Sequence, residues 1–321
     1  MIGSESNAIY AALVEQAVVI TGATASGKSE FAIQVAEAIG GEILSLDSIA
    51  VYRGMDIGTA KPDTEDRARV PHHLIDLAEP DEDFSVAMYL RAAHGLAAEV
   101  TARGKTPIFV GGTPMYLKAI VRGFDPGPAP DWEFRQAVER DVELHGAEKL
   151  YARLQQVDPL SASRIEPNDV RRMIRALEVS KLTGRPLSHR QIQFDHAIDC
   201  SSCCVFWLQH ERRALHQRIN RRVRAMFDRG LIEEVRGLVN RFESLSRTAS
   251  QAVGYRELIE WLRDPGPTEP LMESVAAHTR QLARRQETWF RSFSEITPIE
   301  ATETSEVVDR MVTRIRSSGL G

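Results

Sequence analysis

The stretch Ala17–Gly41 reads AVVITGATASGKSEFAIQVAEAIGG and decides the fold of this chain. Residues 17–21 are apolar or β-branched, as in a buried strand, and residues 29–39 have helical spacing that ends at two glycines. Between them, Gly22–Ser29 satisfies the pattern G-x-x-x-x-G-K-[ST], which is typical of a phosphate-binding loop. The sequence therefore predicts a strand, a phosphate loop and a helix in direct succession.

The composition of this loop predicts what it binds. Its glycines let the backbone wrap around a phosphate, and the N–H groups of the loop and of the helix N-terminus point at the anion. Lys28 supplies a positive charge, and the Ser29 hydroxyl is a ligand for Mg²⁺, which we expect as the cofactor. A diphosphate or triphosphate is expected at Gly22, Thr24, Ala25, Ser26, Gly27, Lys28 and Ser29. The loop alone does not identify a nucleotide.

Strands and helices alternate after the loop. Further strands are expected at 42–46 and 106–110, with a helix at 86–103 between them. Such alternation predicts an α/β fold, in which helices flank a parallel sheet of the P-loop NTPase type.

The pattern changes after Gly123. A linker, FDPGPAPDW, leads to residues 133–184, which are helical in pattern and contain no convincing strand. A strand at 203–208 then returns the chain to the sheet, and basic helices follow it. These segments divide the chain into a catalytic core at 1–123 and 200–300, an inserted all-helical lobe at 124–199, and a polar tail at 301–321 that we expect to be flexible.

Charge is distributed unevenly along the chain. The net charge of −5 argues against a general nucleic-acid binder, yet residues 211–256 contain eleven arginines and five acidic residues. More arginines follow at helical spacing between 280 and 291. This pattern predicts a local basic surface for a nucleic acid, or else a solvated helix face that keeps the protein in solution. No apolar run is long enough to span a bilayer, so we expect a cytoplasmic protein that does not contact membranes.

Asp47 is the carboxylate best placed to act beside the loop. An ATPase or kinase with this loop would carry a Mg²⁺-binding Asp at the end of an apolar strand, but the strand at 106–110 ends in Gly-Gly-Thr. Asp47 ends the strand at 42–46, where ligands of open α/β sheets gather. It is therefore a metal ligand, a general base, or a capping residue without a chemical role.

Seven motifs resemble those of bacterial tRNA dimethylallyltransferases. They are GATASGKS at 22–29, DSIAVYRGMDIGTAKP at 47–62, PHHLID at 71–76, VGGTPMYLKA at 110–119, RRMIRALEV at 171–179, AVGYREL at 252–258 and HTRQLARRQETWFR at 278–291. The resemblance spans roughly residues 17–293, and MDIGTAKP and RRQETWFR are longer than chance would supply.

The resemblance implies a prenyltransferase. The loop would hold dimethylallyl diphosphate rather than ATP, which accounts for the missing second Asp. The dimethylallyl group would be transferred to N6 of the adenosine immediately 3′ of the anticodon, with release of diphosphate. The partner would be the anticodon stem-loop of tRNA, bound by the inserted lobe and the basic helices, and we expect the protein to be a monomer.

The same resemblance assigns roles to individual residues. Asp47 would accept a proton from the adenine amine, which is a weak nucleophile, and Thr113 and Arg222 would act with Lys28 on the departing diphosphate. Contacts with tRNA are implied at Asp47, Ser48, Ile49, Ala50, Thr113, Arg135, Arg171, Arg172, Arg175, Gln251, Gly254, Tyr255, Arg256, Arg284, Arg285, Gln286, Trp289 and Arg291.

Two of these contacts have a second interpretation. Ala50 stands where many members of the family have Gln, so its role would be limited to backbone or shape. Trp289, Phe290 and Phe293 recur at helical spacing, which also indicates ordinary core residues.

Two other functions stay open from the sequence. A metabolite kinase that uses ATP, with Asp47 as base toward a hydroxyl, explains the loop but not the basic helices. A non-catalytic RNA-binding module switched by a nucleotide explains both, but leaves Asp47 without a task.

Overall fold

The computed structural model describes residues 9–190, 197, 203–302 and 304–320. The chain divides into two compact units: a larger one of residues 12–121 and 198–321, and a smaller one of residues 1–11 and 122–197. The expected return of the chain to the core at residue 200 lies outside the described residues. Each unit has a hydrophobic core of its own.

The larger unit is built on a parallel six-stranded sheet with the order β3-β2-β4-β1-β5-β6. The strands are β1 Val18–Gly22, β2 Gly41–Leu46, β3 His72–His73, β4 Thr106–Gly111, β5 Val205–Gln209 and β6 Thr297–Glu300. Strand β1 lies between β4 and β5 and is buried along its whole length. This position agrees with its β-branched sequence and confirms the predicted α/β fold.

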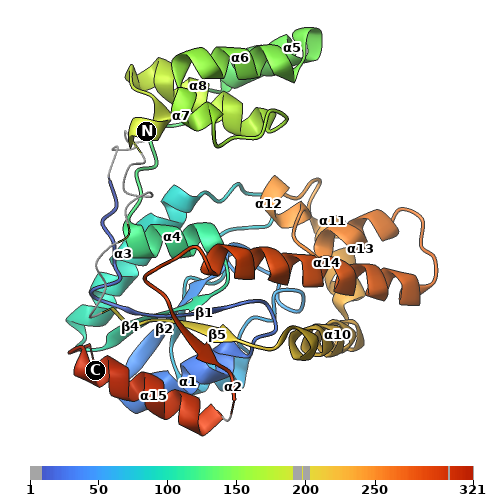
Figure 1. The fold of residues 1–321 in the computed structure, drawn as a ribbon. Coiled ribbons are helices and arrows are strands. Elements are labelled where there is room, and N and C mark those ends of the chain that lie inside the picture. Colours follow the sequence, from blue (N-terminus) through green and yellow to red (C-terminus); the bar gives the residue numbers. More distant parts are fainter. Residues whose placement is uncertain (1–8, 191–196, 198–202, 303, 321) are drawn as a thin grey trace. The chain divides into compact units, whose positions relative to one another are not determined.

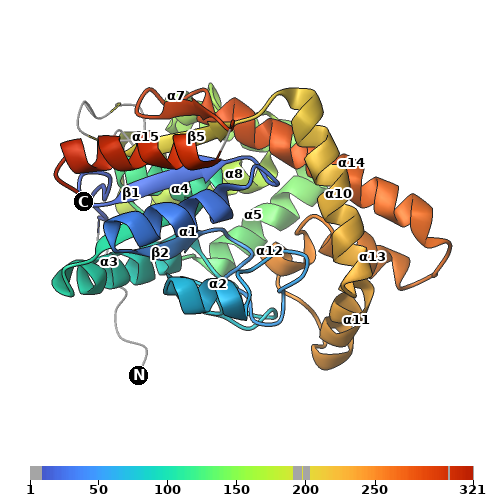
Figure 2. The same cartoon turned by 90° about the horizontal axis from the view of Figure 1, so that it is seen from below.

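Helices cover both faces of this sheet. Helices α1 and α15 pack on one face, and α3 and α14 contact the strands from the other (Figures 1 and 2). The helices of the unit are α1 Lys28–Ile39, α2 Thr64–Arg69, α3 Val86–Ala102, α4 Pro114–Arg122, α10 Arg212–Asp228, α11 Leu231–Arg241, α12 Arg247–Ser250, α13 Tyr255–Trp261, α14 Thr268–Phe290 and α15 Thr304–Ser317. A second apolar cluster joins α10, α11, α13 and α14 to the segment that follows β2.

The prediction of a flexible tail at residues 301–321 is wrong for α15. This helix packs against α1, and its residues Val307, Met311 and Ile315 are fully buried. Strand β6 precedes it and pairs with β5. The three buried residues recur every fourth position, so an apolar helical stripe lies within a segment whose overall composition is polar.

The smaller unit is helical, as predicted. It comprises α5 Trp132–His145, α6 Ala147–Val157, α7 Pro159–Ala162, α8 Val170–Thr183 and α9 Leu187–Arg190. Phe134, Leu150, Leu154, Met173 and Leu177 form the centre of its core. An antiparallel bridge between Tyr10 and Phe124 ties the N-terminal segment to the start of this lobe.

A fully buried carboxylate, Glu178, organises the lobe. It accepts two hydrogen bonds from Arg135, at 2.7 and 2.8 Å, another from Arg175, and one from the Asp131 amide at 2.8 Å. Burial alone would raise the pKa of Glu178, but the hydrogen bonds from the two guanidinium groups lower it below its ordinary value. Arg175 also donates to the carbonyls of Pro126 and Pro128, and thereby fixes the Pro/Gly linker.

Candidate active site

A cavity of about 170 Å³ lies in the larger unit at the carboxyl ends of β1, β2 and β4. Thr24 follows β1, Asp47 follows β2 and Gly112 follows β4, and all three line the cavity. Ligands of parallel α/β sheets bind at this edge. The cavity therefore brings the predicted phosphate loop and the predicted base into one site.

The phosphate loop contributes Thr24, Lys28 and Ser29 to the cavity wall. Helix α1 begins at Lys28, so its N-terminus, with its free amides, lies at the cavity. Gly27 has φ 84°, and a Cβ there would lie 2.8 Å from the Arg218 guanidinium, so only glycine suits the position. Of the predicted loop residues, Gly22, Ala25, Ser26 and Gly27 shape the turn without lining the cavity.

Side chains from distant elements hold the loop from outside. Arg218 Nε donates to the Ala25 carbonyl at 2.8 Å, and His210 Nε2 donates to the Ser26 carbonyl at 2.7 Å. The Gln286 amide accepts from Thr24 N at 2.9 Å and donates to the carbonyl of Gly112 at 2.8 Å, so it links the ends of β1 and β4. Gln286 was predicted to contact tRNA, but its buried side chain is engaged in this link.

Two cations face the cavity close to one carboxylate. The pKa of Lys28 is lowered to about 8, because burial and, to a lesser extent, the positive charge of Arg222 lower it more than the negative charge of Asp47 raises it. Burial also lowers the pKa of the Arg222 guanidinium, again against the influence of Asp47. Lys28 donates to the Ala23 carbonyl at 3.3 Å, and Arg222 to the Thr59 carbonyl at 3.2 Å. With two positive charges and one negative, the site favours an additional anion.

One carboxylate oxygen of Asp47 is hydrogen-bonded to the backbone, and the other is not, among the residues that the structure describes. Its Oδ1 accepts from the amides of Ile49 at 2.8 Å and Ala50 at 3.2 Å, so the capping role is present. Its Oδ2 has no hydrogen-bond partner within the described parts of the chain. Thr113 Oγ1 accepts from the Ser48 amide at 3.0 Å, which places Thr113 beside this turn but outside the cavity wall.

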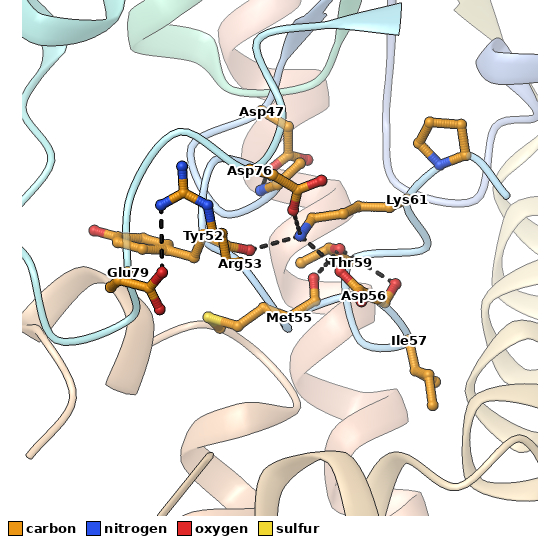
Figure 3. A network of polar contacts seen from close by, with 12 residues as sticks. Asp47, Tyr52, Arg53, Met55, Asp56, Ile57, Thr59, Lys61, Asp76 and Glu79 are labelled. Carbon is orange, nitrogen blue, oxygen red and sulfur yellow. Dashed lines mark hydrogen bonds and ion pairs between the residues drawn. The ribbon is translucent and has the colours of Figure 1, made fainter. Parts of the chain in front are cut away.

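The segment from Gly58 to Pro62 also lines the cavity, although its residues were not among the predicted site residues. Its Lys61 side chain is 2% exposed and donates to the Tyr52 carbonyl at 2.6 Å and to Asp56 and Asp76, each at 2.7 Å (Figure 3). The sequence signal was the motif MDIGTAKP, but the partners of Lys61 are up to fifteen residues away, so only the fold reveals the cluster.

Four predicted tRNA contacts lie on the exposed face of α14 or at its C-terminal end. They are Arg284, Arg285, Trp289 and Arg291, whereas Gln286 and Phe290 face inward. Trp289 is 37% exposed, so its interpretation as a core residue is wrong, although Phe290 and Phe293 are buried. This face presents positive charge together with an aromatic ring.

The other predicted contacts differ in accessibility. Tyr255 is buried, with its hydroxyl 2.6 Å from Glu234, and Arg256 is paired with Glu257 at 2.6 Å. Gln251 is exposed, Ile49 and Ala50 line the main cavity, and Gly254 lines a second cavity of about 60 Å³.

In the lobe, Arg171 and Arg172 are exposed, while Arg135 and Arg175 are bound to Glu178. Their contacts with tRNA stay predictions.

The oxygen donors of the cavity suit Mg²⁺. The Ser29 hydroxyl and the Asp47 carboxylate both line it, and Mg²⁺ is usually held by one or two protein oxygens together with phosphate oxygens of a substrate. Across the described residues, no cluster of three His, Cys, Asp or Glu side chains could hold a metal by itself. His72 and His73 are instead bonded to the Val70 carbonyl and to Glu42.

None of the helices formed by the described residues is long and apolar enough to cross a membrane.

Comparison with known proteins identifies related sequences over most of the chain. The model of the IPP transferase family matches residues 50–293, and that of the isopentenyl transferase family matches residues 15–74. The tRNA dimethylallyltransferase of Rhodopirellula baltica is 53% identical over 308 residues, which cover 94% of this chain and 92% of that protein. The corresponding enzyme of Geobacter sulfurreducens is 46% identical and covers 88% of this chain and 91% of its own length.

Solved structures agree with this result. The tRNA isopentenylpyrophosphate transferase of Bacillus halodurans superimposes with a TM-score of 0.69 at 36% identity, covering 95% of this chain and 98% of the other. A eukaryotic dimethylallyltransferase acting on tRNA superimposes with a TM-score of 0.73 at 26% identity, covering 90% and 75% of the two chains.

Proposed function

The chain belongs to the IPP transferase family of tRNA dimethylallyltransferases, and we propose that it prenylates N6 of the adenosine immediately 3′ of the anticodon. It is a prenyltransferase that modifies tRNA, and neither a metabolite kinase nor a nucleotide-switched RNA-binding module is favoured. The observation that carries the proposal is the shared cavity, which is lined by the phosphate loop, Arg222 and Asp47, whose Oδ2 has no partner among the described residues.

The donor is dimethylallyl diphosphate, with its diphosphate at Thr24, Lys28 and Arg222. As the bond between the allylic carbon and oxygen breaks, negative charge grows on the diphosphate and positive charge spreads over the dimethylallyl unit. Lys28 and Arg222 are each hydrogen-bonded to a backbone carbonyl, and Arg218 holds the loop before α1, so these groups stabilise that negative charge with little reorganisation.

Asp47 is the proton acceptor. The N6 amine forms a bond to the allylic carbon, the carbon–oxygen bond breaks with release of diphosphate, and one amine proton passes to Oδ2 of Asp47. Oδ1 remains bonded to the amides of Ile49 and Ala50, which hold the carboxylate in one orientation during transfer. Thr113 fixes the same turn through the Ser48 amide.

Magnesium is the proposed cofactor, and the Ser29 hydroxyl would be its protein ligand. When bound, the metal supplies additional positive charge to the leaving group. The rest of the chemistry falls to side chains of this chain.

The tRNA is bound by exposed cationic side chains of both units. Support comes from the outward direction of Arg284, Arg285 and Trp289 on α14 and from the exposure of Arg171 and Arg172 in the lobe. Arg side chains suit phosphates, and an exposed indole offers a stacking surface for a base. A cytoplasmic monomer is the form in which we propose that the enzyme works.

The test is transfer of label from radiolabelled dimethylallyl diphosphate to unmodified total tRNA with Mg²⁺. Wild-type protein is expected to label tRNA, and Asp47→Ala to lower the rate by about 10²-fold or more, since a positioned proton acceptor contributes about 10²–10⁴-fold. Digestion of the product to nucleosides then locates the label. Label at a nucleoside other than N6-modified adenosine, or equal rates for the two proteins, would contradict the proposal.

A further inference from the structure

We propose that Glu234 is a positioning residue for this reaction, because its carboxylate holds the loop that orients Arg222 toward the diphosphate of the donor. The inference rests on the proposed function. Glu234 lies on α11 and does not line either cavity, so it acts on the substrate only through other groups.

The Glu234 carboxylate accepts four hydrogen bonds from two separate parts of the chain. Its Oε2 accepts from the amides of Asp56 at 2.9 Å and Ile57 at 2.7 Å. Its Oε1 accepts from the Gly58 amide at 3.3 Å and from the Tyr255 hydroxyl at 2.6 Å. Successive backbone amides around one carboxylate form an anion-binding nest, and here the anion is a side chain of the protein itself.

The loop bound by Glu234 is a compact turn that lines the active-site cavity. Thr59 Oγ1 donates to the Met55 carbonyl at 2.6 Å, and the Lys61 amide donates to the Asp56 carbonyl at 3.1 Å. At its far end, the Lys61 ammonium binds Asp56 and Asp76 (Figure 3). Glu234 therefore fixes the first half of the turn and Lys61 fixes the second.

Tyr255 closes the remaining side of the turn. A Cβ at Gly58 would lie 2.5 Å from the Tyr255 ring, so the ring and the loop backbone are in close contact. Burial and the negative charge of Glu234 raise the pKa of Tyr255 well above its ordinary value, so the hydroxyl keeps its proton and donates it to Glu234. The turn is thus held between α11 and α13.

The link to catalysis is the Thr59 carbonyl. It accepts from Nη2 of Arg222 at 3.2 Å, and no other hydrogen bond of this guanidinium is found among the described residues. Arg222 lines the cavity, where its other N–H groups are available to an anion. Displacement of the turn would release Arg222 from the orientation in which it meets the diphosphate.

The experiment is a double-mutant cycle with Glu234→Gln and Arg222→Gln, with inorganic diphosphate as the probe. Glu234→Gln keeps the shape of the side chain but turns an NH₂ group toward backbone donors. Calorimetry in Mg²⁺ buffer should show about tenfold weaker diphosphate binding than wild type, the size expected for lost hydrogen bonds to a charged group. In the Arg222→Gln background, the same substitution should change the dissociation constant by less than about twofold.

Glu233→Gln is the matched control. Glu233 is the neighbouring residue on α11, it is exposed, and its ion pair with Arg236 spans 3.8 Å. We expect this variant to bind diphosphate as wild type does. In the transfer assay, Glu234→Gln should raise the KM for dimethylallyl diphosphate and leave the KM for tRNA unchanged, a pattern that a general loss of folding would not give.

Two results would overturn the role of Glu234: diphosphate binding equal to wild type in Glu234→Gln, or equal effects of that substitution with and without Arg222. If Glu234→Gln does not fold, Glu234→Asp keeps the charge but withdraws it by one methylene, and the same cycle applies with a smaller expected change. If wild-type protein binds diphosphate but labels no tRNA, the proposed function is refuted. The role of Glu234 in diphosphate binding is still decided by the double-mutant cycle.

Discussion

The lobe and the core both place two cationic side chains near a carboxylate. The two groups of cations differ in how many of their N–H donors are hydrogen-bonded within the protein. In the lobe, Arg135 and Arg175 share the buried Glu178, and Arg175 also bonds two backbone carbonyls. In the core, Arg222 and Lys28 each donate to a single carbonyl and line the same cavity as Asp47. The cations of the first group use several of their donors within the protein, whereas those of the second have donors left for an anion. The number of occupied donors thus separates an arginine that builds structure from one that binds substrate.

The largest expected effect concerns a cation of the core. Lys28→Met removes the charge but keeps the length of the side chain, and should lower kcat/KM for dimethylallyl diphosphate by about 10³-fold, as when a preorganised electrostatic contact to a transition state is lost. The measurement is label transfer at subsaturating donor. The exposed Lys105→Met serves as the control. A loss of less than threefold for Lys28→Met would remove the distinction between the two groups.

The next effect concerns the carboxylate of the lobe. Glu178→Ala leaves two partly buried guanidinium groups without their partner, and should lower the free energy of unfolding of the lobe by about 3 kcal/mol. Because the pKa of Glu178 is lowered in the folded state, its contribution is present above the unfolded pKa and is lost as pH falls through the folded pKa. Urea unfolding with the exposed Glu143→Ala as control measures it. Weakened diphosphate binding in Glu178→Ala would contradict the assignment.

The smallest effect is a pH dependence. Lys28 has its pKa lowered to about 8 in the protein without ligand, so it loses its proton as pH rises from 7 to 9, whereas a bound diphosphate favours the protonated form. The dissociation constant for diphosphate should therefore rise about tenfold over this range, since each pKa unit corresponds to a factor of ten. Calorimetry at several pH values tests this, and Lys28→Met should show a flatter profile. An equal slope in both proteins would assign the titration elsewhere.

Sequence patterns predicted the helices and strands whose formation is indicated by neighbouring residues. The strand before Gly22, the helix after it and the lobe all follow from residue periodicity and turn residues, and the structure has them at nearly the expected positions. Helix α15 was missed, although Val307, Met311 and Ile315 form a stripe, because a polar average concealed it.

Site residues could be predicted from sequence only where the residue type and its motif together indicate a chemical role. Lys28 and Asp47 lie in the cavity as the motif suggested, although their roles stay proposals. The hydrogen-bonding roles of Gln286, Lys61 and Glu234 could not be predicted from sequence, because each bonds to groups that a different part of the fold supplies. Motif length indicated that these segments matter, but the partners depend on the tertiary structure.

The packing of α15 on α1 also bears on how the protein is made. Helix α1 begins at Lys28, and the apolar face it shares with α15 stays uncovered until residues 304–317 have left the ribosome. A nascent chain therefore carries the complete phosphate loop long before α15 can pack on α1. Until then, the incomplete chain exposes the apolar face of α1. A chain that lacked α15 would keep this face of α1 exposed after synthesis, and chaperones and proteases act on proteins that expose apolar surface.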